Sequence, residues 1–217
     1  PTPGRGRRPT ARSITPSAPA EFGCVQVWWG DGKGKTTAAM GMGFRAAGHG
    51  YRVHMLQYMK GGADSVADVR GEYNAIAAMP GSHYGTAGTY GWTRLKCGSA
   101  DAVHQAQADA AVARTEELLS AASAADLTAP LALDGVPDDG VHMLILDGVL
   151  YAVEQELVAP QTVLDLLAAA PDRLELILTG SHTEPTYLVD HADLITAVRK
   201  QKHPFDAGIR ARQGTEY

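Results

Sequence analysis

The chain has 217 residues, a length that suits one medium-sized domain and allows a substantial buried core. Hydrophobic residues make up 45% and charged residues 20%, as in ordinary globular proteins rather than disordered or fibrous ones. The formal net charge of −5 argues against a global polyphosphate-binding surface, such as that of a nucleic-acid-binding protein, but leaves local basic patches open. No apolar run approaches the length of a membrane span. Two cysteines, Cys24 and Cys97, are too few for a disulfide framework, so we expect a cytoplasmic protein.

The first 21 residues are rich in Pro, Ser, Thr and Arg and contain almost no apolar side chains. Segments of this composition cannot bury enough apolar surface to fold alone. We therefore expect residues 1–21 to form a disordered tail and residues 22–217 to form the folded domain.

From residue 22 onward, short apolar runs alternate with segments of helical character. The predicted strands are Cys24–Trp29, Arg52–Tyr58, Met143–Leu146, Leu174–Leu178 and Asp193–Val198. The predicted helices are Thr36–Ala47, Ala102–Ser120, Pro160–Ala169 and Glu184–His191. Two long segments, 61–98 and 123–140, fall outside this alternation and are expected to be loops. The pattern predicts an α/β fold: a mainly parallel β-sheet with helices on both faces and a ligand site beyond the carboxyl ends of the strands.

The strongest local signal is GDGKGKTT at residues 30–37, between the first predicted strand and the first predicted helix. Its glycines allow backbone N–H groups to approach a phosphate, and the helix N-terminus adds a partial positive charge. Lys35 is predicted to reach phosphate oxygens, and the Thr36 hydroxyl is predicted to ligate Mg²⁺. The spacing between the two outer glycines is one residue shorter than in the common phosphate loop. The predicted triphosphate-binding residues are Gly30, Asp31, Gly32, Lys33, Gly34, Lys35, Thr36 and Thr37.

Asp147 ends the apolar run MLILD. Such folds use this position to aim a carboxylate at Mg²⁺ or at its water ligands. A strand-terminal Asp also serves elsewhere as a helix cap, which is the alternative here. The sequence therefore predicts Thr36 and Asp147 as metal-binding residues.

These residues resemble the P-loop corrinoid adenosyltransferases of the CobA/CobO type. The resemblance rests on the short loop, on the block that follows it at residues 38–61, on the strand ends at Asp147 and at residues 178–180, and on the closing run KHPFDAGIRARQGTEY. It implies a P-loop nucleotide-binding fold and a transferase that moves the 5′-deoxyadenosyl group of ATP to Co(I) of a corrinoid, with release of triphosphate, in cobalamin synthesis or salvage. It further implies Mg²⁺, a homodimer, a reduced flavoprotein as electron donor, and residues 1–21 as a lid over the corrinoid.

In this family an aromatic pair in a mid-chain loop lies against the cobalt face and removes the lower axial ligand. The nearest match here is Tyr90-Gly91-Trp92. The resemblance thus implies catalytic roles for Tyr90 and Trp92 beside that of Lys35, because an apolar slab keeps water and ligands away from one axial position. The alternative is that Tyr90 and Trp92 only pack a loop onto the core.

One position departs from the family pattern. The family normally has a Glu directly after the strand-terminal Asp, where it helps to hold Mg²⁺, whereas this chain has Gly148. Metal binding then depends on Thr36, Asp147, phosphate oxygens and water, or on a neighbouring carboxylate such as Glu154.

Two alternatives to the transferase stay open. One is a nucleotide- and corrinoid-binding protein with weak or no turnover because of Gly148, and the other is a different P-loop ATPase or kinase. A basic group near the C-terminus either faces the triphosphate or the corrinoid, or forms a solvated face. Its members are Arg199, Lys200, Lys202, Arg210 and Arg212.

Overall fold

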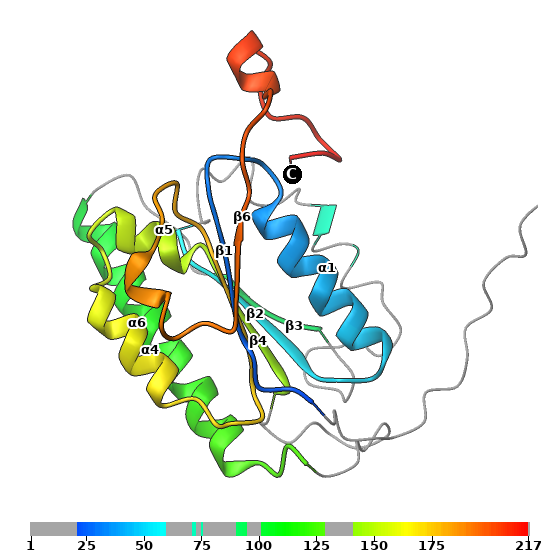
Figure 1. The fold of residues 1–217 in the computed structure, drawn as a ribbon, viewed down its shortest axis with the longest axis vertical. Coiled ribbons are helices and arrows are strands. Elements are labelled where there is room, and N and C mark those ends of the chain that lie inside the picture. Colours follow the sequence, from blue (N-terminus) through cyan, green and yellow to red (C-terminus); the bar gives the residue numbers. More distant parts are fainter. Residues whose placement is uncertain are drawn as a thin grey trace, which may run out of the picture.

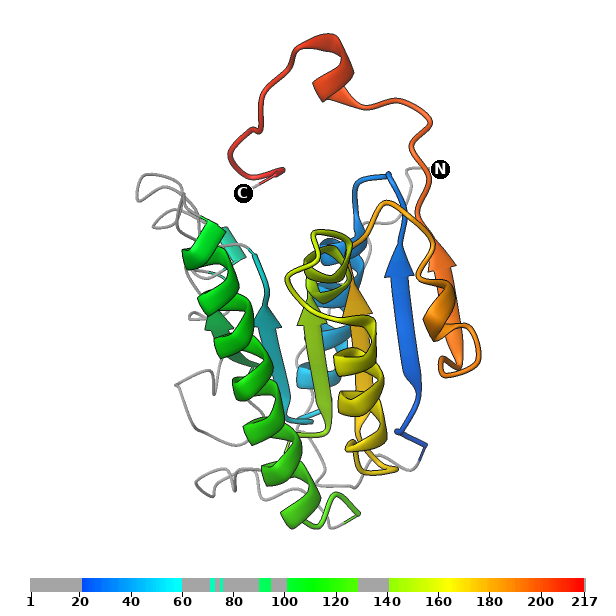
Figure 2. The same cartoon turned by 90° about the vertical axis from the view of Figure 1, so that its left-hand side faces the viewer.

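The structure is a computed structural model, and it describes residues 21–59, 71–72, 75, 90–94, 101–128 and 141–216. Within these residues six parallel strands form one sheet in the order β3-β2-β4-β5-β1-β6. Their carboxyl ends meet at one edge of the sheet, which is uppermost in Figure 2. The strands are β1 (Val25–Trp29), β2 (Val53–Gln57), β3 (Tyr90–Arg94), β4 (Met143–Asp147), β5 (Glu175–Thr179) and β6 (Leu194–Ala197).

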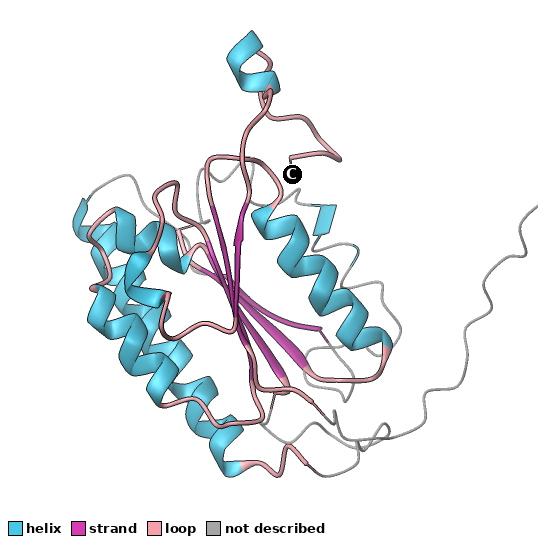
Figure 3. Ribbon diagram, in the orientation of Figure 1, coloured by secondary structure: helices cyan, strands magenta, loops and turns pink. Residues whose placement is uncertain are grey.

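Helices cover both faces of the sheet. The helix α1 (Lys35–Gly48) lies on one face, and α4 (Asp101–Ala124), α5 (Val149–Glu154) and α6 (Pro160–Ala168) lie on the other (Figure 1). Figure 3 shows the strands as one layer between these helices. The predicted α/β fold with a parallel sheet is therefore confirmed. Among the described residues, no helix is both long and apolar enough to cross a membrane.

The five predicted strands and three of the predicted helices are present, with small shifts at their ends. The predicted helix Glu184–His191 is wrong, because this segment forms one short 3₁₀ turn, η1 (Thr186–Leu188). Pro185, the N-cap of this turn, disfavours helical geometry in Glu184 before it, which removes the predicted start of the helix. Sequence reasoning also missed α5 and missed β3, which lies within a segment expected to be a loop. The predicted tail or lid, apart from Glu21, lies outside the described residues.

The central strands divide their side chains between two apolar cores. Met55, Ile145 and Ile177 face α1, and the leucines of β4 and β5 face α4, α5 and α6. Every residue of β4 and β5 is buried, as expected for the centre of a parallel sheet. The buried positions of α1 are all small, which lets this helix approach the sheet closely; they are Ala39, Gly43, Ala46 and Ala47.

His142 is a buried histidine at the amino edge of the sheet, with only 1% of its surface exposed. Its Nδ1 accepts a hydrogen bond from the Arg52 N–H at 3.2 Å, so the ring is neutral. Burial, assisted by the Arg52 charge, lowers the pKa of His142 from 6.5 to about 4. Between these two pH values the unfolded chain binds a proton at this position and the folded protein does not, so acid destabilises the fold.

We expect His142 to reduce the free energy of unfolding by about 3 kcal/mol between pH 7 and pH 4. Urea unfolding across this range measures the loss, and a His142→Gln variant should show a shallower decline. Part of the decline should remain, because burial also lowers the pKa of His54 to about 4. His191→Gln is the matched control, since His191 is exposed. The same decline in the wild type and in His142→Gln would contradict the prediction.

Candidate functional site

The phosphate loop, residues 30–37, leaves the carboxyl end of β1 and leads into α1. The Gly30 N–H donates to the Ser181 carbonyl at 3.0 Å, and the Gly32 N–H donates to the Val198 carbonyl at 2.8 Å. Gly30 has a φ of +119°, and a Cβ there would lie 2.3 Å from the Val198 oxygen, so this position requires glycine. These two N–H groups already donate within the protein, so they are not among the groups that this loop offers to a phosphate.

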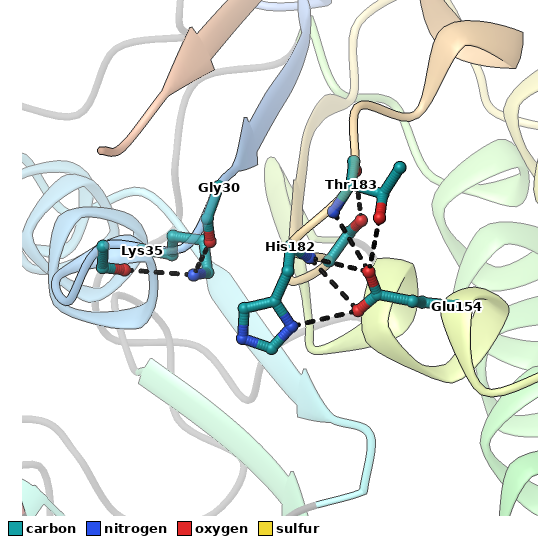
Figure 4. A network of polar contacts seen from close by, with 7 residues as sticks. Gly30, Lys35, Glu154, His182 and Thr183 are labelled. Atoms are coloured by element: carbon teal, nitrogen blue, oxygen red, sulfur yellow. Dashed lines mark hydrogen bonds and ion pairs between the residues drawn. The ribbon is translucent and has the colours of Figure 1, made fainter. Parts of the chain in front are cut away.

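Lys35 points into the curve of the phosphate loop. Its ammonium group donates to the Gly30 carbonyl and, at 3.1 Å, to the Gly32 carbonyl (Figure 4). An ammonium group in this place lies beside the N-terminus of α1, where both the charge and the helix dipole favour an anion. This position is compatible with the prediction that Lys35 contacts phosphate oxygens.

The other two charged residues of the loop contact the C-terminal segment (residues 199–216). Lys33 Nζ pairs with Glu216 Oε1 at 2.6 Å, and Arg212 pairs with the same oxygen at 3.0 Å. Hydrogen bonds from Arg212 and Lys33 lower the pKa of Glu216 to about 2. Asp31 Oδ1 accepts from the Lys200 N–H at 2.9 Å, which lowers the pKa of Asp31. These contacts hold the C-terminal segment above the carboxyl ends of the strands (Figure 2).

Cavities border the phosphate loop on more than one side. A cleft of about 730 Å³ lies between residues 32–37 and residues 214–216 of the C-terminal segment. A cavity of about 290 Å³ is lined by Thr36, Asp147 and His182, among others. A ligand bound on the loop therefore has room both under the C-terminal segment and beside Asp147.

Some of the basic residues predicted near the C-terminus line a cavity, and some form ion pairs within the protein. Arg199 and Lys200 line a third hollow of about 450 Å³ next to the phosphate loop. The Lys200 ammonium pairs with Asp206 at 3.0 Å, and Arg212 pairs with Glu216. Arg199 and Lys200 are thus the members that the described contacts place nearest to the loop.

Asp147 accepts hydrogen bonds from several polar side chains at the carboxyl edge of the sheet. Its Oδ1 accepts from the Thr36 hydroxyl at 2.9 Å and from the Thr179 hydroxyl at 2.5 Å, and its Oδ2 accepts from the Gln57 amide at 3.0 Å. The residue is fully buried, so these bonds offset the cost of removing a carboxylate from water. The structure therefore brings together the two predicted metal-binding residues. Gln57 and Thr179 were missed, although each ends a strand that flanks β4.

The residues at this edge fit a Mg²⁺ ion. Thr36 Oγ1 and Asp147 Oδ1 are oxygen donors of the kind that Mg²⁺ prefers, and their hydrogen bond of 2.9 Å places them side by side. In the part of the chain that the structure describes, no three His, Cys, Asp or Glu side chains form a metal-binding cluster. The pair suits a metal that takes its other ligands from phosphates and water.

Gly148 has a left-handed backbone conformation, with φ +85°, as the N-cap of α5. Its N–H donates to the carbonyl and the hydroxyl of Thr179 at 3.1 and 3.0 Å. A Cβ at this position would lie 2.8 Å from the Tyr58 carbonyl oxygen. The glycine that replaces the family Glu therefore cannot take any side chain unless the backbone moves.

We expect Gly148→Ala to lower the free energy of unfolding by about 1–3 kcal/mol, from backbone strain and the contact with Tyr58. Gly208→Ala is the matched control, because Gly208 has a φ of +75° but a Cβ added there would meet no atom within 4 Å. Urea unfolding should show a larger loss for Gly148→Ala than for Gly208→Ala. An unchanged stability for Gly148→Ala would rule out the conformation described here.

Glu154, the suggested replacement for the missing Glu, has other partners. Its Oε1 accepts from the N–H and the hydroxyl of Thr183, both at 3.0 Å, and both carboxylate oxygens accept from the N–H of His182 at 3.1 Å (Figure 4). Its oxygens are therefore used to hold the loop after β5. These contacts do not support Glu154 as a metal ligand.

Tyr90 and Trp92 lie on strand β3, not in a loop as expected. Along β2, Tyr90 pairs with Val53 and Trp92 pairs with Met55. The backbone of Tyr90 therefore begins β3 at the amino edge of the sheet, opposite to the edge that carries the phosphate loop. The side chains of both residues lie outside what the structure describes, so their catalytic roles stay predictions.

Comparison with known proteins identifies the family. The family described as ATP:corrinoid adenosyltransferase BtuR/CobO/CobP matches residues 21–217. The chain is 30% identical over 200 residues to the corrinoid adenosyltransferase CobA of Salmonella typhimurium, covering 92% of this chain and 88% of that protein. It is 29% identical over 197 residues to the corrinoid adenosyltransferase of Escherichia coli K12, with coverage of 91% and 87%. Its identity to that of Pseudomonas aeruginosa is 29% over 199 residues, with coverage of 91% and 85%. The chain therefore belongs to the ATP:corrinoid adenosyltransferase family and is a transferase.

Proposed function

We propose that this chain transfers the 5′-deoxyadenosyl group of ATP to the Co(I) centre of a corrinoid and releases triphosphate. The observation that carries the proposal is the meeting of Lys35, Thr36 and Asp147 at one edge of the sheet, in a chain that matches the family from residue 21 to residue 217. The extent of this match disfavours both a different P-loop ATPase or kinase and a binding protein without turnover.

In the proposed reaction the substrate Co(I) uses an electron pair to form a bond to C5′ of the ribose. The C5′–O bond breaks, and triphosphate leaves with the electrons of that bond, so cobalt becomes Co(III). The protein supplies position and charge. Lys35 and the start of α1 hold the triphosphate, and this interaction lowers the barrier because it strengthens as negative charge develops on the leaving oxygen.

Mg²⁺ is the metal proposed to accompany ATP. Thr36 and Asp147 would hold it, and its charge would neutralise part of the triphosphate. The hydrogen bonds from Gln57 and Thr179 keep the Asp147 carboxylate in one orientation. This arrangement supports metal binding without a carboxylate at Gly148.

The family resemblance supports further proposals about partners and setting. They are a homodimer, a reduced flavoprotein as the electron donor that generates Co(I), a cytoplasmic location, and a role in cobalamin synthesis or salvage. The resemblance also implies that Tyr90 and Trp92 shield one axial position of the cobalt, which would make its reduction easier. The position of Tyr90 at the start of β3, at the edge opposite to the phosphate loop, does not support that role for Tyr90.

The experiment is an anaerobic assay with the purified chain, ATP, Mg²⁺, cob(II)alamin and a reducing system. Formation of the light-sensitive adenosyl–cobalt product and release of triphosphate are followed together. Product that depends on the protein and on ATP supports the transferase. Hydrolysis of ATP without corrinoid would instead support an ATPase, and binding of both substrates without product would support the non-catalytic alternative.

A further inference from the structure

The loop that follows β5 places an unassigned histidine beside the phosphate loop. His182 lines the cavity that contains Thr36 and Asp147, and it also lines the hollow that contains Arg199 and Lys200. Its side chain is 60% exposed, so the ring is open to a ligand in these spaces. No step of the proposed reaction described above uses this residue.

Glu154 fixes the direction of the His182 ring. Its Oε2 lies 3.1 Å from His182 Nδ1, and the carboxylate also accepts backbone N–H groups of His182 and Thr183 (Figure 4). Burial raises the pKa of Glu154, but the hydrogen bonds from His182 and Thr183 outweigh it and the net shift is downward. An ionised carboxylate only accepts, so Nδ1 is the donor, and a second proton on Nε2 gives the ring an N–H that can donate to an anion.

The loop that carries His182 is held firmly against the phosphate loop. The Ser181 carbonyl accepts the Gly30 N–H at 3.0 Å, and the Ser181 hydroxyl donates to the Thr183 carbonyl. Ser181 has a φ of +56°, a strained conformation for a residue other than glycine and one that concentrates at functional sites. The Tyr151 ring meets the His182 ring edge-on, with centroids 5.7 Å apart. His182 is thus positioned by contacts on several sides.

Cationic side chains line both of the spaces that His182 borders. Lys35 lines one of the two neighbouring spaces, and Arg199 and Lys200 line the other. The acidic groups in these spaces already accept hydrogen bonds, Asp147 from the side chains around it and Asp31 from the Lys200 N–H. A phosphate chain that extends from Lys35 and Thr36 into the cavity beside Asp147 therefore meets a ring nitrogen among cations.

We propose that His182, oriented by Glu154, is a further triphosphate-binding residue, which contacts phosphate oxygens of ATP from the β5 side of the phosphate loop. The inference rests on the proposed function in taking ATP as the substrate. In this arrangement Glu154 is a positioning residue, because it acts through His182. The two side chains provide a charged or polar contact that the phosphate loop alone does not supply.

The test uses inorganic triphosphate and Mg²⁺, titrated calorimetrically into the full chain without corrinoid. His182→Asn keeps a donor near the Nδ1 position for Glu154 but has no atom at the Nε2 position, whereas His182→Gln places an amide near Nε2. We expect His182→Asn to weaken triphosphate binding by about tenfold or more, and His182→Gln to recover part of that loss. Glu154→Gln should also weaken binding. His191→Asn, at an exposed position before β6, is the matched control and should bind as the wild type does.

Two results would overturn the inference. One is triphosphate binding by His182→Asn with the wild-type affinity. The other is the reverse rescue pattern, in which Asn preserves binding and Gln does not, because that pattern assigns His182 a structural role through Glu154. The proposed function is tested separately in the corrinoid assay. If the wild type forms no adenosyl–cobalt product while triphosphate binding still depends on His182, the proposed function fails and this inference stands.

Discussion

Replacing Lys35 with alanine is expected to lower kcat for adenosyl transfer by about 100- to 1,000-fold. The ammonium group of Lys35 lies inside the phosphate loop, against the carbonyls of Gly30 and Gly32. In the reaction it would face the oxygen from which C5′ departs, where negative charge grows in the transition state. Loss of one such preorganised contact raises the barrier by about 3–4 kcal/mol. Initial rates at saturating ATP and corrinoid measure the effect.

Lys33→Ala is the matched control for this prediction. It removes the same charge from the same loop, but the Lys33 ammonium pairs with Glu216, a contact that does not support the predicted binding of triphosphate by Lys33. We expect a much smaller loss of kcat for Lys33→Ala than for Lys35→Ala. Thermal unfolding of both variants checks that the fold is kept. Near-normal turnover in folded Lys35→Ala would show that the phosphate loop is not part of the catalytic site.

Asp147→Asn is expected to lower turnover by about 100-fold and to raise the Mg²⁺ concentration needed for half-maximal activity. Asparagine keeps the shape of Asp147 but removes the charge that attracts a divalent cation. The fold should tolerate the change, because the hydroxyls of Thr36 and Thr179 can rotate and the Gln57 amide can turn to offer its oxygen. Activity measured over a range of Mg²⁺ concentrations tests this prediction.

The control for Asp147→Asn is Asp165→Asn, which makes the same chemical change on the exposed surface of α6. This variant should keep the wild-type rate and the wild-type Mg²⁺ dependence. If Asp147→Asn is folded and shows an unchanged Mg²⁺ dependence, then the Thr36–Asp147 pair does not bind the metal.

The sequence predicts those site residues that lie close together in the chain or stand out within one element. The phosphate loop is contiguous, with glycines, Lys35 and Thr36 between a strand and a helix, so its place in the fold follows from its neighbours. Asp147 is also predictable, since a single carboxylate ends an otherwise apolar strand. Gln57 and Thr179 are harder, because they become site residues only when the strand order puts β2 and β5 on either side of β4.

The failures of prediction arise where long-range contacts decide the structure. The strand β3 is glycine-containing and flanked by loop-like sequence, and it is defined by its pairing with β2 rather than by its own pattern. Glu154 looks like a spare carboxylate in the sequence, but its hydrogen bonds with His182 and Thr183 connect residues nearly thirty positions apart. From the sequence, Gly148 is the loss of a metal-binding Glu. In the structure, a Glu at this position would clash with the Tyr58 carbonyl through its Cβ.

The hydrogen bonds that attach the phosphate loop to its neighbours have a kinetic consequence. The Gly30 and Gly32 N–H groups donate to carbonyls in the segments after β5 and β6, so main-chain atoms set the shape of the loop. The entropy of ordering that part of the chain is then lost during folding and not when the nucleotide arrives. Triphosphate should therefore associate in a single rapid phase, without a slow loop-closing step, and the side chain of Val198 should be able to vary without changing that rate.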